Sequence, residues 1–240
     1  MFMMDLWYFV FLAPGMLLAM WAQWRVQSAY SWASGLGSSV GITGAETAAA
    51  ILQAEHVSGV GIEPVAGQLS DHYDPEGKVL RLSEGVYGSH SLAALGIAAH
   101  EVGHALQDAH RYPLMAVRGA LVPMASLGSG MSWFVILIGT VMLAAHLALG
   151  KVVLLAGIGL FSLTVLFQLV NLPVEFDASR RARIALLQNG LVTQEEDAVV
   201  AKVLDAAALT YVAATLTTIL TLLYYIWRSG LLGGMNSNDE

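Results

Sequence analysis

Four long apolar runs and two polar stretches alternate along the chain. The first run lies within 1–24, and it is about as long as a helix must be to cross the hydrocarbon core of a bilayer. Two more runs fill 119–174 and are separated by little more than Lys151, so they predict a helical hairpin. A last run covers 207–228. The pattern therefore predicts four membrane-spanning helices.

The first apolar run has a competing interpretation, which is a cleaved signal peptide. A signal peptide carries positive charge before its apolar segment, whereas here Asp5 precedes the run and Arg25 follows it. Tryptophan and tyrosine also lie near both ends of the run, as is typical of the two membrane surfaces. We therefore expect a retained membrane anchor.

The two polar stretches, 25–118 and 175–206, determine the expected orientation. Four spans place both stretches on the same side of the membrane, and they hold five and four of the eleven lysines and arginines. The positive-inside rule makes that side cytoplasmic. The sequence thus predicts an integral membrane protein with both stretches in the cytoplasm. The tail, 229–240, is rich in Gly, Asn and Ser and is expected to be flexible.

The composition agrees with a membrane protein and limits its chemistry. Hydrophobic residues make up 56% of the chain and charged residues 12%, against roughly 25% charged residues in soluble domains. The net charge of -7 argues against nucleic acid as a partner, because phosphate binding requires a basic face. Cysteine is absent, so any metal must be held by His, Asp or Glu.

The stretch "AAHEVGHALQDAH", 98–110, carries the most specific chemistry. Residues four apart share one face of a helix, so His100 and His104 can bind one zinc ion through their imidazole nitrogens. In H-E-x-x-H sites the glutamate, here Glu101, is the general base that activates water. Gly103 leaves room for the close approach of another element. The alternative is a helix with two incidental histidines.

The residues around this helix suggest where it lies and what it faces. The apolar part that precedes the motif is too short to span a bilayer, so we expect a core helix at or near the membrane surface. The segment 77–87 has strand character and predicts an edge strand, along which an extended substrate could pair. An ordinary edge strand without a ligand is the alternative.

The third metal ligand has several candidates. His110 stands where an extended form of the motif has its third histidine, but a continuous helix would turn it roughly 120° away from His104. Glu175 follows the third apolar run, and Pro173 predicts that a new helix begins just before it. Asp177 is a nearby rival to Glu175. The residues by themselves leave this choice open.

The segments "DHYDPEGKVLRLSEGVY", "AAHEVGHALQ" and "VEFDASRRA", in this order between four apolar runs, resemble the YugP-type family of bacterial membrane zinc metallopeptidases. The resemblance covers roughly 6–227. It implies a mainly α, four-span protein of the bacterial inner (cell) membrane, with a zincin-like region of active-site helices and a small β-sheet. The family is remotely similar to the HtpX and CAAX-prenyl proteases, in which the glutamate of an E-x-x-x-D pattern is the third zinc ligand. Glu175 takes that place here, while Ser179 replaces the aspartate and Asp177 is the alternative carboxylate.

The predicted function is that of a gluzincin-like zinc endopeptidase. Zinc on His100, His104 and Glu175 would activate a water molecule, and Glu101 would be the catalytic base. The partners implied are a peptide or protein substrate, in or near the membrane, and the lipid bilayer. The candidates for stabilising the developing oxyanion are His72, Tyr73 and Arg183.

Two other functions compete with proteolysis. One is a non-proteolytic membrane scaffold or quality-control binding protein that keeps the metal, and the presence of Glu101 argues against it. The other is a transporter, which would carry ionisable groups within its spans, where only His146 and Gln168 stand out as polar. "DHYDP", 71–75, reads first as a turn.

Overall fold

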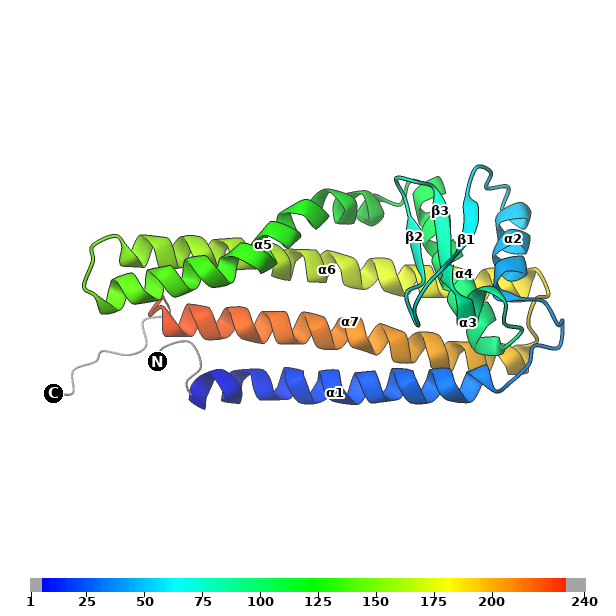
Figure 1. Cartoon of the computed structure of the whole chain (residues 1–240), viewed down its shortest axis with the longest axis horizontal. Helices are drawn as coiled ribbons and strands as arrows, with labels where there is room; N and C mark the ends of the chain where they lie inside the picture. Colours follow the sequence, from blue (N-terminus) through cyan, green and yellow to red (C-terminus); the bar gives the residue numbers. More distant parts are fainter. Residues whose placement is uncertain (1–5, 232–240) are drawn as a thin grey trace. The chain divides into compact units, whose positions relative to one another are not determined.

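The computed structural model describes residues 6–231, and these are mainly helical (Figure 1). The expectations for 1–5 and for the tail from 232 onward lie outside the described residues. The helices and strands follow one another in the order α1 (Leu6–Ser34), α2 (Gly44–Ala54), β1 (Gly61–Val65), β2 (His72–Asp74), β3 (Val79–Ser83), α3 (Glu84–Tyr87), α4 (Leu92–Ala109), α5 (Pro113–Ala144), α6 (Gly150–Gln188) and α7 (Gln194–Arg228).

The described chain forms two compact units, which we call the apolar unit and the polar unit. The apolar unit holds 6–20, 117–172 and 211–231. The polar unit holds 21–116 and 173–210. Helices α1, α5, α6 and α7 each continue from one unit into the other, because their bounds cross these limits.

The apolar unit contains the membrane spans. Helices α1, α5, α6 and α7 are each long and apolar enough to cross a membrane, which confirms the predicted four spans. Large apolar side chains are exposed on these helices, among them Trp7, Leu127 and Phe134. Such exposure is unfavourable in water and favourable in lipid. The exposed apolar surface therefore suits helices that lie in a bilayer.

The helical hairpin of α5 and α6 depends on close packing at glycine. A Cβ atom on Gly139 would lie 2.4 Å from the main-chain nitrogen of Leu154. Membrane helices commonly approach each other at small residues in this way, because apolar burial alone gives little preference for helix contacts over lipid contacts.

The prediction that a helix begins at Pro173 is wrong, because α6 runs without a break from Gly150 to Gln188. A proline removes only one main-chain hydrogen bond of the helix, and packing can offset that loss. The residues just beyond it, Val174, Ala178 and Ala182, are buried. Their contacts keep the helix continuous at Pro173, where local propensity alone would favour a break.

The polar unit contains a small sheet with the strand order β1-β3-β2. Strand β3 pairs parallel with β1 and antiparallel with β2. The predicted edge strand at 77–87 is therefore wrong: β3 is central, and 84–87 forms α3. Val79, Leu80 and Leu82 are buried on both faces of β3, as is typical of a central strand.

One edge strand of the sheet is β2, which pairs with β3. It occupies part of the segment 71–75, for which the sequence predicts a turn. "DHYDP" thus contains a strand, His72–Asp74, and the turn comes directly after it. The Asp74 carboxylate accepts the main-chain N–H groups of Glu76 and Gly77, both at 3.0 Å. The turn chemistry was recognised correctly but placed a few residues too early.

The core of the polar unit lies between α2, the sheet and α4. Ile51 on α2, Leu80 and Leu82 on β3, and Leu95 and Val102 on α4 are fully buried in one apolar cluster. Because α4 packs inside this cluster, its position relative to the sheet is fixed by apolar burial. The polar side chains on its remaining face are therefore held on a rigid support.

We expect Gly139→Ala to lower the melting temperature of the detergent-purified protein by an amount equivalent to ~1–3 kcal/mol, because the added methyl group would overpack the α5–α6 contact. Gly130→Ala is the matched control on the same helix, since a Cβ there meets nothing within 4 Å. Alanine favours helix by ~1 kcal/mol, so the control should keep or raise the melting temperature. Equal shifts for both variants would contradict the packing.

Candidate active site

The motif helix α4 begins at Ser91, whose hydroxyl accepts the N–H of Ala94 at 3.2 Å. The helix continues to Ala109 and places His100 and His104 on the same face, with their ring centres 4.9 Å apart. The Ser91 cap and the apolar packing of the first turns explain why the helix forms here. The i, i+4 geometry predicted from the sequence is therefore present.

The structure brings Glu175 of α6 to the two histidines of α4. Its Oε2 atom lies 3.3 Å from His100 Nε2 and 3.4 Å from His104 Nε2. One ligand atom from each residue lies within 4.8 Å of the others, and Glu175 is 2% exposed. We call these three residues the triad.

The triad fits a zinc ion in both spacing and donor chemistry. Tetrahedral ligands at about 2.0–2.1 Å from zinc are about 3.3–3.4 Å from one another, which is the spacing between Oε2 and each Nε2. Two imidazoles and one carboxylate form a known catalytic donor set with a position left for water.

The hydrogen bonds behind the triad strengthen this fit. His104 Nδ1 lies 3.0 Å from Oε1 of Gln107, an acceptor, so in the neutral ring Nδ1 carries the proton. His104 Nε2 then presents a lone pair towards the carboxylate of Glu175. His100 Nδ1 lies 3.1 Å from the Ser179 hydroxyl, which leaves its Nε2 facing the same carboxylate. This arrangement suits a cation between the three side chains.

Gly103 is the residue that lets α4 and α6 approach. A Cβ at this position would lie 2.4 Å from the carbonyl oxygen of Ala178 on α6. The helices therefore touch main chain to main chain, one turn from Glu175. This is the close approach that the glycine of the motif predicted.

Glu101 is buried beside the triad and faces β2. The main-chain N–H of Tyr73 donates a hydrogen bond to its carboxylate. Burial raises the pKa of Glu101 above its ordinary value, and the nearby carboxylate of Glu175 acts in the same direction. A carboxyl group with a raised pKa holds a proton more readily, which suits a general base that must accept one and pass it on.

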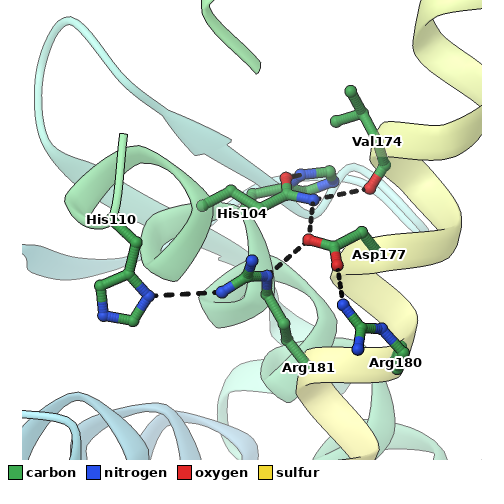
Figure 2. A network of polar contacts seen from close by, with 7 residues as sticks. His104, His110, Val174, Asp177, Arg180 and Arg181 are labelled. Atoms are coloured by element: carbon green, nitrogen blue, oxygen red, sulfur yellow. Dashed lines mark hydrogen bonds and ion pairs between the residues drawn. The ribbon is translucent and has the colours of Figure 1, made fainter. Parts of the chain in front are cut away.

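Two of the rival ligands are engaged elsewhere, as Figure 2 shows. His110 caps α4 at its C-terminus, and its Nδ1 lies 3.3 Å from Arg181 Nη1. Asp177 accepts hydrogen bonds from Gln107, Arg180 and Arg181. Neither belongs to the group of side chains that converge on a metal position.

The three oxyanion candidates also have partners away from the triad. The hydroxyl of Tyr73 donates to Asp108 at 2.6 Å, and burial together with this bond raises the pKa of the phenol. His72 Nδ1 lies 2.8 Å from the carbonyl oxygen of Ser70. Arg183 donates two hydrogen bonds to Asp197, at 3.0 and 2.6 Å. Each of the three therefore has a polar partner of its own, and a part in oxyanion stabilisation stays a prediction.

Sequence reasoning overlooked Gln107 and the main chain of Tyr73. Gln107 lies in the motif helix, but the H-E-x-x-H pattern gives it no role. Its spacing of three residues from His104 was the available signal, since such residues lie on adjoining parts of one helix face. The contact between Tyr73 and Glu101 links β2 to α4, and no local pattern announces it.

Comparisons with known proteins agree with a metallopeptidase site. The family model described as "Putative neutral zinc metallopeptidase" matches residues 8–230. The chain is 44% identical over 220 residues to "Putative membrane protease YugP" of Bacillus subtilis (strain 168), which covers 91% of this chain and 95% of the relative. No solved structure matches the chain.

We expect the detergent-purified protein to hold about one zinc ion per chain, measured by elemental analysis. Glu175→Ala should lose most of it, because the carboxylate provides one of the converging acceptors. His110→Ala should keep it, since His110 contacts Arg181 instead. The reverse pattern, with zinc lost only in His110→Ala, would move the metal to the end of α4 and contradict the triad.

Proposed function

The chain belongs to the family of neutral zinc metallopeptidases, and from that premise we propose that it is a membrane-embedded endopeptidase with zinc held by His100, His104 and Glu175. The convergence of these three side chains on one position is the observation that carries the proposal. Membership of the family implies zinc and a peptide or protein substrate. The residue roles and the membrane-proximal substrate are the proposed part.

The chemistry of the reaction follows from the donor set and from Glu101. When bound, zinc supplies a Lewis acid that polarises the peptide carbonyl and makes water easier to deprotonate. Glu101 takes the proton from the attacking water and passes it to the leaving amine. The buried position of Glu101 and its bond from the Tyr73 N–H hold the carboxylate in place for both transfers.

The neighbouring edge strand gives the substrate a place to lie. We propose that an extended segment of the substrate pairs with β2, since β3 is central and β2 is the edge that reaches Glu101. Strand addition of this kind uses main-chain hydrogen bonds and therefore accepts many sequences. Selectivity would then depend on which segments can come near the membrane.

The proposed substrates are membrane proteins or membrane-proximal segments. Glu175 follows the apolar part of α6 within the same helix, so the metal position is tied to a membrane span. The charge pattern supports a site that faces the cytoplasm of a bacterial inner membrane.

A metal-binding scaffold without proteolysis is the alternative function. A scaffold needs the triad but has no use for a buried carboxylate next to it. Burying Glu101 costs free energy, because a carboxyl group loses its hydration. That cost is understandable in an enzyme, where the same burial adjusts the group for proton transfer.

Glu101→Gln is the direct test of catalysis. We expect it to lower the rate of peptide hydrolysis by ~10²–10⁴-fold, because the amide cannot accept a proton, while zinc content stays at the wild-type value. The rate is measured with a membrane-anchored peptide or protein in detergent or proteoliposomes. Hydrolysis at the wild-type rate would exclude Glu101 as the general base.

The absence of cysteine allows a clean test of the orientation. Leu147→Cys and Gln188→Cys place single, exposed thiols near the two ends of α6. In spheroplasts, a membrane-impermeant maleimide should label the thiol at 147 directly and the thiol at 188 only after permeabilisation. Labelling of 188 in sealed spheroplasts would place the site outside the cell.

A further inference from the structure

We infer that Gln107 is a positioning residue of the zinc site, which fixes the His104 ring and clamps α4 to α6 with one side-chain amide. The inference rests on the proposed zinc-binding role of the triad and assigns a function to a residue that the H-E-x-x-H motif does not contain.

The amide of Gln107 makes three hydrogen bonds in a buried position. Its Oε1 lies 3.0 Å from His104 Nδ1. Its Nε2 donates to the carbonyl oxygen of Val174 at 2.8 Å and to Asp177 Oδ2 at 3.0 Å. Because both of these partners are acceptors, they determine which end of the amide is nitrogen. The side chain is completely buried, so water cannot replace any of the three bonds.

The first consequence concerns His104. With Oε1 directed at its Nδ1, the ring is held in the tautomer that leaves Nε2 for the metal. Partners behind a metal-binding histidine restrict ring rotation and raise ligand basicity, and their loss typically lowers metal affinity ~10–100-fold. Ser179 occupies the corresponding place behind His100.

The second consequence concerns Glu175. The two acceptors that Gln107 reaches on α6 are Val174 and Asp177, which lie one residue before and two residues after Glu175. Gln107 therefore holds both the His104 ring and the turn of α6 that presents the carboxylate. The Gln107 amide thus restrains both His104 and the residues around Glu175, and so the distance between the two ligands.

The Asp177 carboxylate is itself held by two cations, as Figure 2 shows. Arg180 and Arg181, on the same helix, donate to it, and Arg181 continues to His110 on α4. The Asp177 side chain is 9% exposed, so these pairs offset much of the cost of burying its charge. A carboxylate fixed in this way gives Gln107 a rigid acceptor.

The test uses the whole chain in detergent and reverses the direction of the hydrogen bond between Gln107 and Asp177. In Gln107→Glu, two carboxylates face each other at the position of the 3.0 Å bond. In the double variant Gln107→Glu/Asp177→Asn, the donor and the acceptor are exchanged while the total charge of the pair is unchanged. Gln107→Leu removes the polar group, and Gln53→Leu, on the exposed side of α2, is the matched control.

Zinc affinity is measured by competition with a chromophoric chelator, and the melting temperature of the metal-free protein reports on folding. We expect Gln107→Leu and Gln107→Glu to bind zinc ~10–100-fold more weakly than wild type, and the control to bind it equally well. The double variant should recover part of the loss in Gln107→Glu, because the hydrogen bond between positions 107 and 177 is restored while the bond to the Val174 carbonyl oxygen stays absent. Absorption of the Co²⁺-substituted protein should shift in the single variants and return in the double variant.

The outcomes separate this inference from the proposed function. Wild-type zinc affinity in Gln107→Leu, or no recovery in the double variant at an unchanged melting temperature, overturns the positioning role and leaves the peptidase proposal intact. If Gln107→Leu does not fold, the recovery in the double variant decides. If Gln107 behaves as expected while Glu101→Gln retains full hydrolysis, the positioning role stands and the proposed mechanism falls.

Discussion

The contact between α4 and α6 at Gly103 is the constraint on which the site depends. The helices meet main chain to main chain, and any side chain at this position would occupy the space of the Ala178 carbonyl oxygen. Only at this separation can the short carboxylate arm of Glu175 reach both Nε2 atoms, and only then can Gln107 reach the carbonyl oxygen of Val174. A wider spacing would disconnect the ligands and their support together.

The continuity of α6 has a second effect, because one helix carries both a candidate membrane span and the proposed metal ligand Glu175. The apolar residues of the helix are held by lipid and by neighbouring helices, and Val174, Ala178 and Ala182 are held by the polar unit. Pro173 lies between these regions without ending the helix. The Glu175 carboxylate is therefore anchored at the point where the apolar run of α6 stops.

Local patterns in the sequence were sufficient for the spans and for the two histidines, since both depend on helical or apolar periodicity over short distances. They were insufficient for Pro173, where tertiary packing outweighs an unfavourable local preference, and for β3, whose central place depends on two partners elsewhere in the chain. The link from Gln107 to Asp177 joins residues 70 positions apart. Such a contact follows from how α4 and α6 pack, and the sequence contains no local sign of it.

Glu175 and Asp177 lie close together on α6, but their surroundings suit them to different roles. Asp177 faces one amide and two guanidinium groups, so its oxygens are occupied by donors and it would be a poor metal ligand. Glu175 instead faces two imidazole nitrogens, each of which can bind a metal ion in its neutral form. Pairing with Asp177 also offsets part of the positive charge of Arg180 and Arg181, which would otherwise repel a divalent cation nearby more strongly. Asp177, which the sequence offers as a rival ligand, thus helps Glu175 to serve as the proposed metal ligand.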